Sequence, residues 1–107
     1  MATVLWITYA CTGETVELTD EALEHIRSEH PDLAVDEDML RMTVQRPDVC
    51  TLEVDGSLNF YAKGIVPRRT GRYLHVLVRR GGHEAQLEVR SAWASKAVDH
   101  PYEEILC

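Results

Sequence analysis

The alternation of apolar and polar residues in the second half of the chain is the feature that most constrains the fold. Four segments have the period of two that is typical of β-strands: residues 49–54, 57–66, 73–80 and 85–93. The stretches between them contain turn-forming residues, namely "DG" at 55–56, "PRRTGR" at 67–72 and "RGGHE" at 80–84. Because connections this short join neighbouring antiparallel strands, the sequence predicts a four-stranded antiparallel meander.

Two helices are predicted ahead of this meander. The first begins with Thr19 or Asp20 as its N-cap and ends at His30, because the proline that follows disfavours helical geometry in the residue before it. The second runs from an N-cap at Asp36 to a stop at Pro47. Acidic residues in the first turn of each segment favour helix formation at these positions.

The remaining segments complete the predicted architecture. Residues 4–10 ("VLWITYA") and 15–18 ("TVEL") are typical of strands, and the tail 94–106 ("ASKAVDHPYEEIL") favours a short helix interrupted near its proline. The sequence therefore predicts one domain, residues 1–107, of the α+β class. In it, N-terminal helices pack on a four-stranded antiparallel sheet.

The charge is unevenly distributed along the chain. The net charge is −7, and residues 1–40 contain ten acidic side chains and one basic side chain, Arg27. Residues 41–90 contain nine basic and five acidic side chains. An acidic protein does not bind nucleic acid through its overall charge, but the basic middle part keeps a nucleic-acid interaction open.

The cysteines and the apolar runs bear on location. Cys11, Cys50 and Cys107 are odd in number and lack the spacing of a zinc knuckle, which favours reduced thiols in the cytoplasm over a disulfide framework. No apolar run approaches the roughly 20 residues of a membrane helix. The first residues have no basic region before an apolar one, so they resemble a strand more than a signal peptide. We expect a cytoplasmic protein without membrane contact.

Alternation within the last two strands predicts the direction of their side chains. In 85–93, the residues Leu87, Val89, Ser91 and Trp93 share one face. The apolar members predict that this face packs on the helices, which would make Ser91 a buried hydroxyl in need of a partner. His75, His83 and His100 have no evident partner in the sequence and are expected on the surface.

Five motifs, in this order, carry a family resemblance: "LTDEALEHIRSEHPDL", "MLRMTVQRPDV", "LNFYAKGI", "RYLHVLVRR" and "EVRSAW". The series resembles the phage-associated members of the barnase–EndoU–colicin–RelE-like (BECR) nuclease superfamily, to which BrnT-type toxins are a close relative. It covers roughly residues 16–95. The resemblance implies a BECR-like fold and a ribonuclease of phage, toxin–antitoxin or effector context.

The resemblance also implies a set of site residues. The family's helix histidines match His25 and His30, and the hydroxyl of its last strand matches Ser91. The positions that would bind the substrate phosphate match Tyr61, Lys63, Arg68, Arg69 and Arg72. The family fixes no spacing for the arginines, and it does not decide between the two histidines.

Active members of this superfamily cleave RNA without a metal or another cofactor. The ribose 2′-hydroxyl attacks the neighbouring phosphate and leaves a cyclic phosphate, which requires a base, an acid and a cation. Histidine suits the first two roles and arginine the third. RNA is the implied partner, because only RNA has this internal nucleophile. A toxin context adds a cognate inhibitor or antitoxin protein.

Simpler explanations stay open for the same residues. His30 is typical of a capped helix end, and His25 of a solvated neighbour of Glu21 and Glu29. A metal site is disfavoured, because the two histidines are five residues apart and two ligands on one helical turn prefer a spacing of four. The alternative function is a catalytically inactive BECR-fold protein. Its acidic segment "ETVELTDEALE" would bind a basic protein or mimic nucleic acid.

Overall fold

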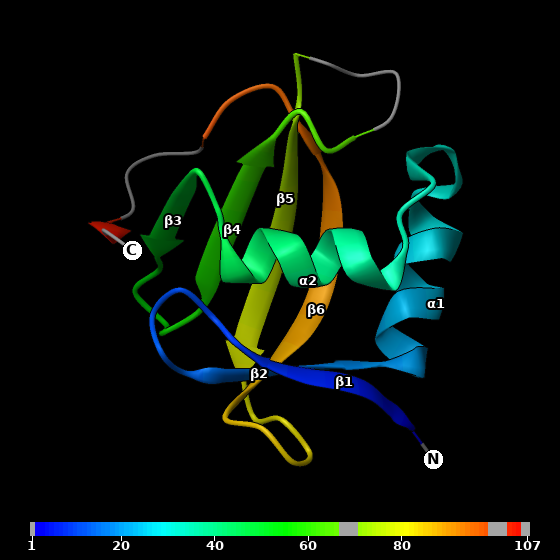
Figure 1. Cartoon of the computed structure of the whole chain (residues 1–107), viewed down its shortest axis with the longest axis vertical. Coiled ribbons are helices and arrows are strands. Elements are labelled where there is room, and N and C mark those ends of the chain that lie inside the picture. Colours follow the sequence, from blue (N-terminus) through cyan, green and yellow to red (C-terminus); the bar gives the residue numbers. More distant parts are fainter. Residues whose placement is uncertain (1, 67–70, 99–102, 106–107) are drawn as a thin grey trace.

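The computed structural model describes residues 2–66, 71–98 and 103–105. Seven strands form one mixed sheet, in the order β1-β2-β6-β5-β4-β3-β7. The elements in chain order are β1 (Val4–Tyr9), β2 (Thr15–Thr19), α1 (Asp20–Glu29), the 3-10 turn η1 (Pro31–Leu33), α2 (Glu37–Gln45), β3 (Val49–Leu52), β4 (Leu58–Lys63), β5 (Tyr73–Arg80), β6 (Leu87–Ser95) and β7 (Glu103–Ile105). In Figure 1, α2 crosses the central strands and α1 lies beside β6.

The predicted fold class is wrong, although its central part is present. Strands β3, β4, β5 and β6 form the predicted antiparallel meander. The sheet does not end there, because β2 pairs in parallel with the start of β6 and β1 pairs with β2. The chain is therefore a mixed α/β fold and does not have N-terminal helices packed on a four-stranded sheet.

Two physical features explain this difference. An isolated meander would leave the edge of β6 with unpaired backbone groups, and β2 supplies partners for them. The chain between β2 and β6 contains both helices and strands β3 to β5, so it is long enough to bring β2 parallel to β6. At the other edge, β7 pairs antiparallel with β3. Residues 103–105 are thus a strand where the sequence predicted part of a helix, and residues 99–102 lie outside the described residues.

The two helices begin and end as the sequence predicted. Thr19 Oγ1 accepts a hydrogen bond from the Ala22 N–H at 3.2 Å, and Asp36 Oδ1 accepts one from Met39 at 2.9 Å. Both are N-cap contacts that satisfy otherwise unpaired amide groups. His30 is the C-cap of α1, immediately before Pro31.

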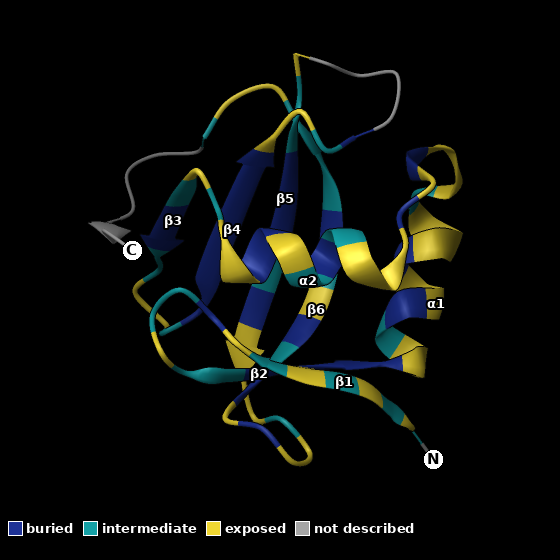
Figure 2. Cartoon of the chain, in the orientation of Figure 1, coloured by how far each residue is buried: buried dark blue, intermediate teal, exposed yellow. Residues whose placement is uncertain are grey.

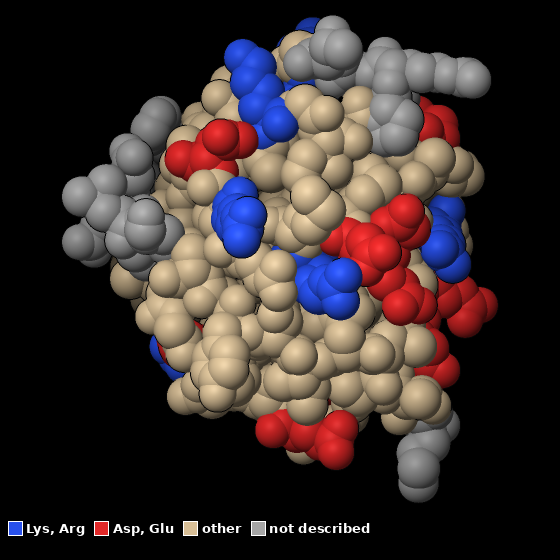
Figure 3. Space-filling model, in the orientation of Figure 1, with Lys and Arg blue, Asp and Glu red and all other residues tan. Residues whose placement is uncertain are grey.

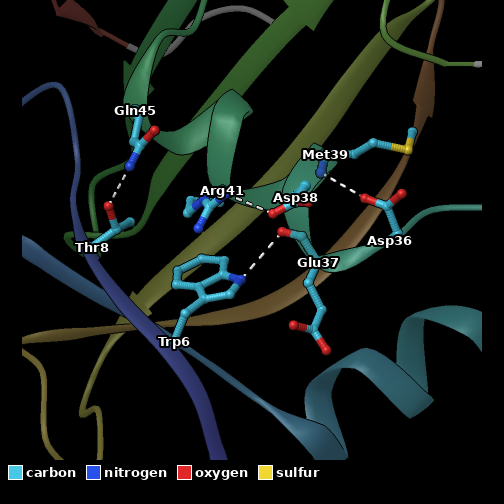
Figure 4. A network of polar contacts seen from close by, with 8 residues as sticks. All are labelled: Trp6, Thr8, Asp36, Glu37, Asp38, Met39, Arg41 and Gln45. Carbon is cyan, nitrogen blue, oxygen red and sulfur yellow. Dashed lines mark hydrogen bonds and ion pairs between the residues drawn. The ribbon is translucent and has the colours of Figure 1, made fainter.

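Polar contacts fasten α2 to β1 at both of its ends (Figure 4). The Trp6 Nε1–H donates to the Glu37 carbonyl at 3.2 Å, and Gln45 Nε2 donates to Thr8 Oγ1 at 2.6 Å. Between these contacts, the inner side of α2 is buried against the sheet. Figure 2 shows the buried residues concentrated on the central strands and on the inner sides of the helices.

The cysteines differ from the prediction of reduced thiols. Cys11 is disulfide-bonded, so that prediction is wrong for this residue. Cys50 is a buried free thiol, and burial together with the nearby charge of Glu14 raises its pKa to about 12. Such a thiol stays protonated near neutral pH and is a poor nucleophile.

No helix in the described part of the chain has the length and apolar character needed to cross a membrane.

Truncation of Leu40 tests the packing of α2. Leu40 is fully buried, whereas Met42 on the same helix is 53% exposed. We expect Leu40→Ala to lower the free energy of unfolding by about 2–5 kcal/mol, because it removes buried methyl groups and leaves a cavity. Met42→Ala, the matched control, should change it by less than about 0.5 kcal/mol. Urea denaturation measures both, and equal effects would contradict this placement of α2.

Candidate functional site

An open pocket of about 390 Å³ lies between the first half of α1, the β5–β6 connection and the start of β6. Its ionisable lining residues are Glu21, His25, His83, Glu88 and Arg90. They come from three separate parts of the chain. The pocket thus brings two imidazoles, two carboxylates and one guanidinium to a single place.

The start of β6 positions two of these side chains. Glu88 pairs with Glu17 across the parallel β2–β6 pair. Beyond it, Val89 pairs with Val78 but Ser91 pairs with Leu77, so Arg90 is the extra residue of a β-bulge. Arg90 Nη1 donates to Glu88 Oε1 at 2.8 Å. The bulge therefore presents an arginine at the pocket and holds it beside a carboxylate.

Glu17 lies next to the pocket and is completely buried. Its Oε1 accepts hydrogen bonds from the backbone N–H groups of Glu84 at 2.7 Å and Ala85 at 2.9 Å. Its Oε2 is also buried and has no hydrogen-bond partner within the described parts of the chain. Buried polar atoms normally have a partner. One oxygen of this carboxylate therefore accepts two hydrogen bonds, and the other accepts none from the described residues.

The pKa of Glu17 lies below its ordinary value of 4.5. Burial raises this pKa, because it disfavours the charged form. The backbone N–H groups of Ala85, Glu84 and His83, together with the His83 side chain, lower it by more. The β5–β6 connection thus stabilises a buried negative charge.

The "GG" of this connection allows the chain to pass close to that carboxylate. Gly81 has a φ of 101°, a conformation that favours glycine. A Cβ at position 82 would lie 2.9 Å from Glu17 Oε1 and closer still to the Ala85 carbonyl oxygen. No side chain fits there, so Gly82 is required for the loop to close over Glu17.

His25 lies in the middle of α1 on the edge of the pocket. Its side chain is half-exposed, and its Nε2 lies 3.3 Å from Glu29 Oε1, one helical turn further on. His83 is an exposed residue of the β5–β6 connection. One of its ring nitrogens lies within 4.8 Å of a carboxylate oxygen of Glu17 and of one of Glu88, and these two oxygens also lie within 4.8 Å of each other.

Of the predicted site residues that the structure describes, only His25 lines this pocket. His30 caps the far end of α1, with its Nε2 4.0 Å from Glu29 Oε2, and does not line the pocket. Tyr61 and Lys63 lie on β4, and Arg72 precedes β5. Arg68 and Arg69 lie outside the described residues.

The predicted direction of Ser91 is wrong. Leu77 and Val78 are consecutive in β5 and point to opposite faces, so their partners Ser91 and Val89 do too. The bulge at Arg90 turns Ser91 away from the helix-packed face. Ser91 therefore is not a buried hydroxyl on the core side.

The face of Ser91 also holds Tyr61 and His75, in an arrangement that the sequence did not predict. The Tyr61 and His75 rings are in tilted contact with centroids 4.2 Å apart, and the Trp93 ring is in tilted contact with His75 at 4.1 Å. His75 was expected on the surface, but it is buried and its Nε2 lies 2.6 Å from Asn59 Oδ1. Tyr61 is fully buried as well, which favours a structural role.

Sequence reasoning missed Glu17, His83, Glu88 and Arg90. The available signal was weak: an acidic residue between two apolar ones in "VEL", and a histidine after "GG". Neither signal indicates that β2 and the β5–β6 connection meet, because 71 positions separate the contacting residues Thr15 and Gln86.

Comparison of the chain with protein-family models, with curated proteins and with solved structures found no match in any of the three. The resemblance to BECR nucleases therefore stays a prediction from short motifs.

Replacement of Glu17 by glutamine tests the buried charge. A carboxylate whose pKa is lowered by folding stabilises the protein above its unfolded-state pKa, and this contribution is lost as the pH falls through the folded-state value. At pH 7 we expect Glu17→Gln to lower the free energy of unfolding by about 1.5–3 kcal/mol, the range for hydrogen bonds to charged groups. This difference from the wild type should shrink as the pH falls below 4.5.

Urea denaturation of both proteins between pH 7 and pH 3 measures this difference. The matched control is Glu84→Gln, whose side chain lies on the same connection but is exposed. A difference for Glu17→Gln that stayed constant with pH would show that folding does not lower the pKa of Glu17.

Proposed function

We propose that this protein is a metal-independent endoribonuclease that cleaves RNA at the pocket between α1 and β6. The observation that carries the proposal is the convergence of His25, His83 and Arg90 on one open pocket. Two imidazoles supply a base for the 2′-hydroxyl and an acid for the leaving oxygen. A guanidinium supplies the positive charge that the phosphate needs as it becomes more negative.

The surroundings of His25 suit proton transfer. Glu29 lies against Nε2, which orients the imidazole and leaves Nδ1 as the nitrogen that exchanges a proton. This is the general arrangement of a catalytic base held by a carboxylate. His83 lines the same pocket from an exposed loop, and we assign it the second proton-transfer role.

The negative charge of the pocket must be overcome for a phosphate to bind. Glu21 and Glu88 repel a phosphate, and the ion pair between Arg90 and Glu88 offsets only part of that repulsion. The Arg90 guanidinium has further N–H donors that remain for the substrate. The proposal therefore assigns Arg90 the main contact with the phosphate.

A toxic ribonuclease implies a protein partner and a location in the cell. A cell that makes a toxic ribonuclease needs an inhibitor or antitoxin protein, and such a protein would cover the pocket. We propose a cytoplasmic location, because the RNA substrate is there. The disulfide of Cys11 counts against it, since disulfides are uncommon in a reducing compartment.

One observation favours a second function, the binding of a basic protein. The residues Asp20, Glu21, Glu24 and Glu29 of α1 are all exposed. Figure 3 shows acidic side chains gathered on the side of the molecule where α1 lies. Such a surface attracts a basic partner or mimics the charge of a nucleic acid. This function requires no catalysis.

Cleavage of a mixed tRNA and messenger RNA pool in EDTA tests the ribonuclease. We expect the wild type to leave cyclic phosphate ends, and His25→Ala and His83→Ala to lose about 10²–10⁴-fold in rate, because each removes an acid or a base. Arg90→Lys should also lose activity, since lysine lacks the bidentate geometry.

The matched control is His30→Ala, a histidine on the same helix that does not line the pocket. It should retain the rate of the wild type. Folded wild-type protein that cleaves no RNA would contradict the proposal and favour the binding function. A loss in His30→Ala equal to that in His25→Ala would place the site elsewhere on α1.

A further inference from the structure

We propose that Glu17, His83 and Glu88 bind one divalent transition-metal ion where the pocket meets the buried Glu17. These three are a group of potential ligands whose donor atoms all lie within 4.8 Å of one another. They combine a buried carboxylate, a half-buried carboxylate and an exposed imidazole. The pairing of β2 with β6 places the two carboxylates side by side, and the β5–β6 connection adds the imidazole.

The independent observation is the second oxygen of Glu17. Oε2 is buried, belongs to a completely buried side chain and has no hydrogen-bond partner in the described residues. This oxygen belongs to a carboxylate group and lies in a place that water does not reach. A buried charge needs a counter-charge or a donor. A cation held also by His83 and Glu88 supplies it.

The ligand types indicate the kind of metal. An imidazole nitrogen with two carboxylate oxygens suits Zn²⁺ or Mn²⁺, whereas Mg²⁺ and Ca²⁺ prefer oxygen ligands alone. Bonds of about 2.0–2.2 Å place tetrahedral ligands about 3.4 Å apart. The ligand atoms must therefore close by a short distance from their present separation, and the exposed His83 is free to make most of that movement.

Glu17 is held by contacts outside the proposed ligand set. Two backbone N–H groups, those of Glu84 and Ala85, hold Glu17 Oε1 in place. Such hydrogen bonds from outside the ligand set orient a metal ligand and strengthen binding. Three protein ligands with an open side toward the pocket leave coordination positions for water or for a phosphate oxygen.

Arg90 opposes the cation. Its Nη1 holds Glu88 Oε1 at 2.8 Å and adds a positive charge next to the site. A bound metal must share Glu88 with this guanidinium. We therefore expect the metal to bind more tightly when Arg90 is replaced by glutamine, which removes the charge and releases the carboxylate.

The metal site also bears on the proposed ribonuclease, and this consequence alone rests on the proposed function. A metal bound to His83 removes that imidazole from proton transfer. Zn²⁺ should therefore inhibit RNA cleavage, and EDTA should restore it. The pocket can then either bind a metal or cleave RNA, but not both at once.

Titration calorimetry with ZnCl₂ on protein freed of metal tests the site without any activity. The wild type should bind one Zn²⁺, and MgCl₂ should give no heat. His83→Ala should weaken Zn²⁺ binding more than about 10-fold, as loss of a ligand costs at least as much as loss of a supporting contact. Arg90→Gln should bind more tightly than the wild type. His25→Ala, another histidine of the pocket, should bind like the wild type.

Glu17→Gln should lose Zn²⁺ binding as well, with circular dichroism to verify that it folds. If it does not fold, His83→Ala decides, because an exposed loop histidine is not needed for folding. Absence of Zn²⁺ heat with the wild type, or equal binding by His83→Ala, would overturn the proposal. Zn²⁺ binding without RNA cleavage would support the metal site and contradict the proposed ribonuclease. RNA cleavage without Zn²⁺ binding would support the ribonuclease and contradict the metal site.

Discussion

The parallel pairing of β2 with the start of β6 is the constraint on which the rest of the structure depends. It is short, with Val16 opposite Leu87 and Glu17 opposite Glu88. Thr15 and Gln86 strengthen it, because the Gln86 N–H donates to Thr15 Oγ1 and the Thr15 N–H donates to Gln86 Oε1. This pairing attaches the N-terminal hairpin to the meander and brings Glu17 to the β5–β6 connection.

The same pairing explains why a charged residue is tolerated in the interior. Val16 and Leu18 join the core, so the alternation of the strand directs Glu17 to the opposite face. There the backbone N–H groups of Glu84 and Ala85 compensate for part of the lost hydration. The two consecutive glycines let the connection fold tightly enough to bring these donors to the carboxylate. The buried carboxylate of Glu17 therefore depends on the glycines of the β5–β6 connection, and the connection depends on the carboxylate to accept its backbone N–H groups.

Local signals in the sequence predicted the elements well but not the assembly. The predicted helix ends are confirmed. They depend on contacts within a few residues, made by the N-caps Thr19 and Asp36 and by the prolines Pro31 and Pro47. The meander followed from short connections. The β2–β6 pairing joins distant residues, so no local pattern reports it. The bulge at Arg90 adds one residue to a regular alternation, and it reversed the predicted direction of Ser91 without changing the strand prediction.

The candidate site is unpredictable for the same reason. His25 was proposed because it matches a helix histidine of the family that the motifs resemble. Glu17, His83, Glu88 and Arg90 come together only through the distant pairing, which no motif reports. The two proposed activities also share these groups. A neutral imidazole with a free lone pair is needed for metal binding and for general base catalysis alike. A pocket that meets one requirement thus meets much of the other, and the balance of charge from Arg90 and the carboxylates decides which ligand it takes.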